Sequence, residues 1–129
     1  MLGKVIRILV ADDHPIVRQS IVALLNREPD MEVVGTAVNG REAIETAQTT
    51  QPDVIVMDIS MPELDGIRAA GEIQQMGLAV PVIMLSMHHN SALVKQARKN
   101  GAVAYIVKQQ ANNALVPAIR AASEGSASR

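Results

Sequence analysis

Short, mostly apolar runs alternate with segments of helical periodicity five times along this chain of 129 residues. Runs that are nearly continuous in apolar residues are typical of parallel strands whose two faces are both covered by helices. We expect strands at Val5–Ala11, Glu32–Ala37, Val54–Met57, Val80–Leu85 and Val103–Val107. Because a helical pattern follows each run, the sequence predicts an α/β fold in which helices cover both faces of a parallel sheet through right-handed crossovers.

Signals at the helix ends support this prediction. The first three helices are expected to begin at Pro15, Asn39 and Asp65. Serine is preferred at helix N-caps, so we expect Ser91 to cap the fourth helix. Asn112 or Asn113 is expected to begin the last helix, where Pro117 would lie close enough to the start to be tolerated. The order of the strands in the sheet does not follow from these periodicities.

Charged residues stand where three of the expected strands end. Asp12 and Asp13 follow the first strand, Asp58 follows the third, and Lys108 follows the fifth. The carboxyl ends of parallel strands share one edge of the sheet, where ligands bind, so we expect these side chains to converge. Two unit charges about 4 Å apart repel by roughly 4 kcal/mol at an effective dielectric constant near 20. Three carboxylates there predict a hard divalent cation, and the lysine suits an incoming phosphoryl group.

Composition limits the class of protein. A chain of 129 residues suits one domain, and a hydrophobic content of 48% argues against disorder. The chain contains no cysteine, which excludes disulfides and thiolate metal sites. Its net charge of −1 gives no sign of the basic surface that nucleic-acid binding usually requires. No apolar run approaches the ~20 residues of a membrane span, so we expect a cytoplasmic protein that does not bind a membrane.

Four segments resemble the receiver domain of two-component response regulators. They are Ile8–Pro15, Val56–Gly66, Leu85–His88 and Gly101–Lys108, in that order and each at an expected strand end. The resemblance covers essentially the whole chain and is closest to the NarL/FixJ subfamily, whose receivers precede a LuxR-type helix-turn-helix. It implies a flavodoxin-like (βα)5 fold, which is a doubly wound parallel sheet with strand order 2-1-3-4-5.

The resemblance also implies a role for each acidic residue. Asp58 would be the phosphoacceptor, whose carboxylate attacks a phosphohistidine and becomes an acyl phosphate. Asp13 and Asp58 would bind Mg²⁺ directly. Asp12 would contribute mainly through water, and Ser60 through its backbone carbonyl. Mg²⁺ prefers near-octahedral oxygen ligands that include waters and phosphate. With Lys108 it would stabilise the equatorial oxygens of the transferring phosphoryl group.

Two further positions match the switch residues of the family. The hydroxyl of Ser86 would turn to a phosphoryl oxygen, and Tyr105, the one aromatic residue, would move inward as the serine loop closes. Met87 follows the switch serine and is bulky enough to shield an acyl phosphate from water, so we expect slow self-dephosphorylation. The implied partners are a sensor histidine kinase or phosphotransfer protein and a second copy of the chain. The protein would be no enzyme beyond catalysing its own phosphorylation and dephosphorylation.

The resemblance predicts one domain followed by a short C-terminal segment. Residues 1–122 are expected to form the receiver, and residues 123–129, rich in small polar residues, a frayed tail or the start of a linker. No helix-turn-helix follows in this chain, so control of transcription and contact with DNA would run through an output domain that is absent here. The chain is then either cut after the receiver or a stand-alone receiver or phosphorelay protein.

Three other functions stay open. A Mg²⁺-dependent phosphohydrolase of the haloacid-dehalogenase type also forms an aspartyl phosphate, but its acids lie in an Asp-x-Asp motif, whereas Asp12 and Asp13 are adjacent. A flavin- or nucleotide-binding module would need a glycine-rich phosphate loop after the first strand, which the sequence lacks. A phosphorylation-independent interaction domain would take no phosphate from acetyl phosphate and Mg²⁺.

Some of these residues also have plain structural interpretations. The pair Asp12-Asp13 suits a solvated turn that favours the following helix. His14, His88 and His89 lack the spacing of a metal-ligand set, and we interpret them as solvated loop residues.

Overall fold

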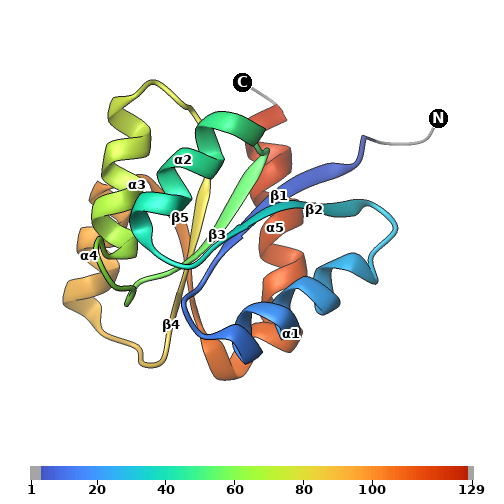
Figure 1. The fold of residues 1–129 in the computed structure, drawn as a ribbon. Coiled ribbons are helices and arrows are strands. Elements are labelled where there is room, and N and C mark those ends of the chain that lie inside the picture. The colour runs from blue at the N-terminus through green and yellow to red at the C-terminus, as the bar shows by residue number, and fades with distance from the viewer. Residues whose placement is uncertain (1–3, 128–129) are drawn as a thin grey trace.

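The computed structural model describes residues 4–127 and contains one sheet of five parallel strands (Figure 1). The strands are β1 (Ile6–Ala11), β2 (Met31–Ala37), β3 (Val54–Asp58), β4 (Val82–Ser86) and β5 (Ala102–Val107). Their order in the sheet is β2-β1-β3-β4-β5. The doubly wound flavodoxin-like fold implied by the resemblance is therefore confirmed.

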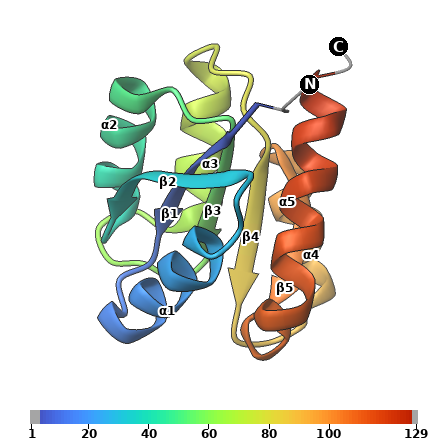
Figure 2. The same ribbon diagram turned by 90° about the vertical axis from the view of Figure 1, so that its right-hand side faces the viewer.

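Helices cover both faces of the sheet (Figures 1 and 2). They are α1 (Pro15–Asn26), α2 (Gly40–Thr50), α3 (Gly66–Gln75), α4 (Ser91–Lys99), the 3₁₀ turn η1 (Lys108–Gln110) and α5 (Ala111–Ala127). Buried side chains of α1 and α5 form one core with one face of the sheet, while those of α2, α3 and α4 form a second core on the other face. No helix within residues 4–127 has the length and apolar character that crossing a membrane requires.

The pairing of the strands brings their carboxyl ends level. Ala11 of β1 pairs with Met57 of β3, so the residues that follow them, Asp12 and Asp58, stand side by side. At the other side of β3, Ser86 of β4 pairs with Val107 of β5, the residue before Lys108. The register therefore brings residues at the carboxyl ends of four strands to one edge of the sheet.

Burial singles out the same edge. The core is aliphatic, and every residue of β3 and β4 is buried. Among the described residues, the buried polar or charged ones are Asp12, Asp58 and Ser86. Charged groups are seldom buried unless they are paired or bind metal. The fold thus concentrates its buried polarity at the carboxyl ends of β1, β3 and β4.

The structure corrects the predicted cap of α4. Asn90, rather than Ser91, is the N-cap, because its Oδ1 accepts the backbone N–H groups of Ala92 and Leu93 at 3.0 and 3.1 Å. Ser91 is the first helical residue. Asparagine and serine are both preferred caps, so composition alone does not separate adjacent candidates.

The structure also moves the start of the last helix. A 3₁₀ turn from Lys108 leads directly into α5 at Ala111, so the prediction of a start at Asn112 or Asn113 is wrong. Pro117 consequently lies inside the helix, where it removes the hydrogen bond to the carbonyl of Asn113. Asn113 is exposed, so water can bind that carbonyl.

The sequence predicts a frayed tail or the start of a linker over residues 123–129. Helix α5 continues through Ala127, and residues 128 and 129 lie outside the described residues. A domain boundary at residue 122 stays a prediction.

Gly66 holds the loop after β3 against the start of α3. Its N–H donates to the carbonyl of Ile59 at 2.8 Å, and an added Cβ would overlap the backbone carbonyl oxygen of Asp58. We expect Gly66→Ala to lower the free energy of unfolding by about 1–3 kcal/mol, because the backbone would have to move. Urea denaturation measures the loss. Gly125→Ala, where nothing lies within 4 Å of the added Cβ, is the control and should cause no loss. Equal stabilities of the two variants would contradict the prediction.

Candidate functional site

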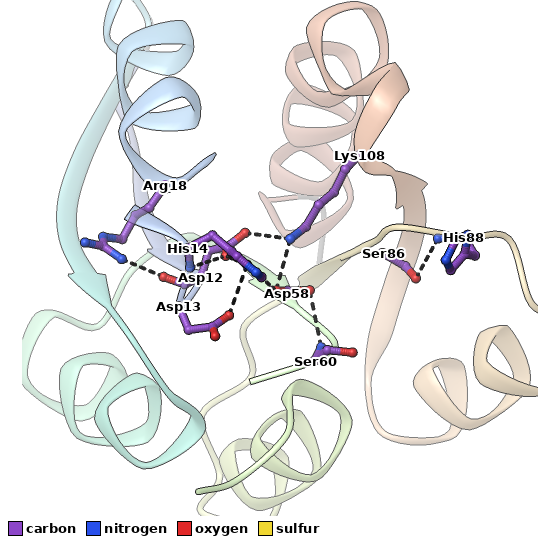
Figure 3. A network of polar contacts seen from close by, with 9 residues as sticks. All are labelled: Asp12, Asp13, His14, Arg18, Asp58, Ser60, Ser86, His88 and Lys108. Atoms are coloured by element: carbon purple, nitrogen blue, oxygen red, sulfur yellow. Dashed lines mark hydrogen bonds and ion pairs between the residues drawn. The ribbon is translucent and has the colours of Figure 1, made fainter. Parts of the chain in front are cut away.

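Asp58 is the last residue of β3, and its side chain is 3% exposed. Its Oδ1 accepts the backbone N–H of Ser60 at 3.2 Å, and its Oδ2 lies 3.0 Å from the Nζ of Lys108 (Figure 3). One oxygen is thus held by the loop that follows β3 and the other by the β5–α5 connection. The carboxylate is fixed in direction and faces the carboxyl edge of the sheet.

Lys108 connects two carboxylates. Its Nζ lies 3.0 Å from Asp12 Oδ2 as well as 3.0 Å from Asp58 Oδ2, and its side chain is 9% exposed. Strand β5 ends at Val107, level with Ser86, and the 3₁₀ turn begins at the next residue, Lys108. A nearly buried ammonium that contacts two acids is unlike a solvated surface lysine.

Asp12 and Asp13 differ in exposure. Asp12 is fully buried, and its backbone N–H continues the β1–β2 ladder by donating to Ala37 at 3.0 Å. Its Oδ1 accepts the backbone N–H of His14 at 2.9 Å, which fixes the turn into α1. The Asp13 side chain is partly exposed. The predicted convergence of the strand-end acids and the lysine is therefore present in the structure.

The pKa values follow from burial and from these ion pairs. Burial raises the pKa of Asp58, the hydrogen bond from Lys108 opposes that shift, and the charge of Asp12 adds to it. Burial alone would lower the pKa of Lys108, but its hydrogen bonds to Asp12 and Asp58 outweigh it and raise that pKa. The raised pKa keeps the lysine cationic at neutral pH, and a further cation beside Asp58 would favour the ionised form of that carboxylate.

The acids fit a divalent metal ion. One ligand atom each from Asp12, Asp13, His14 and Asp58 lies within 4.8 Å of all the others. Asp13 Oδ1 is a buried oxygen that accepts no hydrogen bond, whereas the buried Asp12 Oδ2 lies 3.0 Å from the Lys108 ammonium. Hard carboxylate oxygens are the ligands that Mg²⁺ prefers. The donor set therefore fits the predicted Mg²⁺, which Asp12, Asp13 and Asp58 would hold.

Ser86 and Tyr105 both contact the β4–α4 loop. Ser86 is buried, and its Oγ accepts the backbone N–H of His88 at 3.3 Å. The Tyr105 hydroxyl donates to the backbone carbonyl of His88 at 3.0 Å, and its ring lies edge-on to His89 with centroids 6.2 Å apart. The two residues proposed as a switch thus hold opposite sides of one residue of this loop.

A cavity of about 320 Å³ lies between this loop and the acids. Its lining residues are His14, Asp58, Ser60, Ser86, Met87, His88, Asn90, Leu93 and Lys108. Asp58 therefore has open space in front of it that is large enough for a phosphoryl group.

Sequence reasoning missed one member of the cluster. His14, interpreted as a solvated loop residue, places its Nδ1 3.2 Å from both Asp12 Oδ1 and Asp13 Oδ1. The spacing of His14, His88 and His89 argues only against a ligand set made of these three histidines together. The position of His14 directly after the acidic pair was the available signal.

A flavodoxin-like sheet with buried acids and a lysine at its carboxyl edge defines a receiver-type domain. The family profile described as "Response regulator receiver domain" matches residues 8–120. The chain belongs to this family.

Relatives and solved structures agree with this assignment. The chain is 41% identical over 116 residues to the transcriptional regulatory protein PdtaR of Mycobacterium tuberculosis, covering 90% of this chain and 56% of that protein. It is 35% identical over 122 residues to the transcriptional regulatory protein DegU of Brevibacillus brevis, covering 95% and 52%. The signal receiver domain of NarL from Mycobacterium tuberculosis superposes with a TM-score of 0.91 at 32% identity, covering 95% and 99%. The predicted similarity to NarL-type receivers is confirmed, and the chain spans about half the length of these two relatives.

Proposed function

We propose that this chain accepts a phosphoryl group on Asp58 in a Mg²⁺-dependent reaction and changes conformation in response. The observation that carries the proposal is the buried Asp58 carboxylate, held 3.0 Å from the Lys108 ammonium beside the buried Asp12. A structural ion pair would need one acid. Here two buried acids share one lysine, a third acid lies beside them, and Asp58 also lines a cavity, which suits the transfer of a charged group.

The chemistry follows from these contacts. An oxygen of Asp58 attacks the phosphorus of a phosphohistidine, the phosphorus–nitrogen bond breaks, and the electron pair leaves with the histidine of the donor. Lys108 donates to the oxygens on which negative charge accumulates. When bound, Mg²⁺ neutralises charge on the carboxylates and the phosphoryl oxygens. Ser60 orients Asp58 through its N–H, and its backbone carbonyl is proposed as a further metal ligand.

The switch would act through the β4–α4 loop. A phosphorylated Asp58 carries new anionic acceptor oxygens on the cavity that Ser86 also lines. If the Ser86 hydroxyl turns to one of them, its contact with the His88 N–H is lost. Tyr105 holds the carbonyl of that same residue, so the loop and the tyrosine would rearrange together. Two arrangements of this loop give the bistable element that such a switch requires.

The wider role is proposed from the family. The phosphoryl donor would be a sensor histidine kinase or phosphotransfer protein in the cytoplasm, and phosphorylation would favour a homodimer. The two relatives described above are named transcriptional regulatory proteins, which supports control of a DNA-binding output domain. A stand-alone receiver in a phosphorelay is the alternative. In either case the chain catalyses only its own phosphorylation and dephosphorylation.

Intact-mass analysis tests the proposal. After incubation with acetyl phosphate and Mg²⁺, the protein should gain the mass of one phosphoryl group, and EDTA should prevent the gain. The same protein should not turn over a generic phosphomonoester, which a haloacid-dehalogenase-type hydrolase would do. No gain in mass under conditions where Mg²⁺ binds would overturn the proposal and favour a phosphorylation-independent interaction domain.

Met87 lies on the wall of the cavity in front of Asp58. Its side chain is among the more exposed large hydrophobic groups, at 53% exposed surface. We expect Met87→Ala to speed the loss of phosphate about three- to tenfold, because water reaches the acyl phosphate more easily. Mass analysis after removal of acetyl phosphate gives the rate. Met76→Ala changes a comparably exposed methionine at the end of α3 and should leave the rate unchanged. Equal rates in all three proteins would contradict the prediction.

A further inference from the structure

His14 points its ring into the acidic cluster. Its Nδ1 lies 3.2 Å from Asp12 Oδ1, 3.2 Å from Asp13 Oδ1 and 4.0 Å from Asp58 Oδ2 (Figure 3). No other residue outside the three acids has a metal-ligating side-chain atom in this cluster, within the part of the chain that the structure describes. A nitrogen donor is therefore already in position among the oxygen donors.

The backbone keeps the ring there. The N–H of His14 donates to Asp12 Oδ1 at 2.9 Å, and Pro15 begins α1 immediately afterwards. His14 is the N-cap residue of α1, but its side chain makes no capping hydrogen bond. The imidazole is thus free from the task that side chains at this position usually perform. Its side chain is 60% exposed, which gives it room to adjust by the few tenths of an ångström that ligation requires.

The distances match those between ligands of one ion. Ligands about 2.1 Å from a metal stand about 3.0 Å apart when adjacent in an octahedron and about 3.4 Å apart in a tetrahedron. The separations of 3.2 Å fall between these values, and the separation of 4.0 Å is close to that of opposite ligands in an octahedron. Asp13 Oδ1 is a buried oxygen that accepts no hydrogen bond, and it faces the ring rather than Lys108, so it supplies a second sign that a cation belongs here.

We propose that His14 is a metal ligand, so that this site takes borderline divalent transition metals with one imidazole nitrogen in addition to carboxylate oxygens. The inference rests on the proposed metal site and changes its selectivity. Imidazole favours ions such as Co²⁺, Ni²⁺ and Zn²⁺ over Mg²⁺, which prefers oxygen alone. Such ions would compete with Mg²⁺ for the site and would engage a residue that Mg²⁺ leaves unbound.

Two measurements test the proposal on the purified protein without any phosphoryl donor. Pulsed EPR of the Cu²⁺-loaded protein detects a bound imidazole through its ¹⁴N modulation, because Cu²⁺ belongs to the ions that accept imidazole ligands. Calorimetry gives the affinities for Co²⁺ and Mg²⁺. We expect ¹⁴N modulation in the unaltered protein and its loss in His14→Asn. That variant should also lose about tenfold or more in Co²⁺ affinity, with little change in Mg²⁺ affinity.

His89→Asn is the matched control, because His89 lies on the β4–α4 loop against Tyr105 and outside the acidic cluster. It should keep the ¹⁴N modulation and both affinities. Absence of modulation in the unaltered protein, or equal losses of Co²⁺ and Mg²⁺ affinity in His14→Asn, would overturn the proposal. In that case the ring only donates a hydrogen bond to Asp12.

A further variant separates this inference from the proposed metal site. Asp13→Asn should weaken binding of both ions. If it leaves both affinities unchanged, the metal site itself is wrong, and the His14 inference falls with it. If it weakens both ions and the nitrogen signal is absent, only the role of His14 is wrong.

Discussion

Asp58→Asn should take up no phosphate from acetyl phosphate and, in EDTA at neutral pH, should unfold at a higher urea concentration than the unaltered protein. The amide has no oxygen nucleophilic enough to form the acyl phosphate. The gain in stability has a separate cause: burial raises the pKa of Asp58, so its ionised form is disfavoured in the folded state. Asparagine removes the buried charge, keeps an oxygen for Lys108, and leaves that lysine its contact with Asp12.

The pH dependence distinguishes this cause from a general effect on packing. A group whose pKa is raised by folding contributes its stability at low pH and loses it as the pH rises through the raised value. The advantage of Asp58→Asn should therefore be largest at neutral pH. It should shrink as the pH falls through the raised pKa of Asp58, because the unaltered side chain then becomes neutral as well.

Asp53→Asn is the control for this experiment. Asp53 is exposed at the start of β3, and its Oδ2 accepts the N–H of Arg7, a role that an amide oxygen can fill. This variant should take up phosphate fully and gain no stability at neutral pH. Stoichiometric phosphate on Asp58→Asn would show that the acceptor is another residue.

The candidate site was predictable because its residues carry two signals in the sequence: they stand at the ends of apolar strands, and they lie in the segments that resemble the receiver family. Asp12, Asp58 and Lys108 each follow an apolar strand, and the parallel sheet brings such positions to one edge whatever the order of the strands. Strand order itself depends on which strands pair over long distances, and it came only from the resemblance. The motif segments carried that information because they occur in a fixed order, each at a strand end.

Local details were harder to predict where two neighbours could perform the same task. Asn90 and Ser91 are both good caps, and the geometry of the β4–α4 loop decides between them. The start of α5 moved to Ala111 because a 3₁₀ turn follows Lys108. The position of the His14 ring depends on the turn after β1, where the backbone N–H of His14 donates to Asp12. The spacing of the histidines in the sequence does not reveal this hydrogen bond.

Lys108→Met should slow phosphate uptake on Asp58 about 100- to 1,000-fold, the usual cost of removing one group that stabilises charge in the transition state. Methionine has a similar length and no charge, so the loss reports the ammonium that lies 3.0 Å from both Asp12 and Asp58. The same change should lower the free energy of unfolding in EDTA by about 3 kcal/mol, because two buried acids lose their shared partner. Mass analysis over time and urea denaturation measure the two effects.

The two effects of Lys108→Met should separate when Mg²⁺ is added. A bound metal would neutralise the acids and should restore much of the stability, but it would not replace the hydrogen-bond donor that Lys108 supplies to the phosphoryl oxygens, so the rate stays low. Lys95→Met, on the exposed surface of α4, should change neither quantity. If Mg²⁺ restores the rate together with the stability, Lys108 serves only to hold the acids together. Its placement between two carboxylates would then be structural, and the charge of the transferring group would be met by the metal alone.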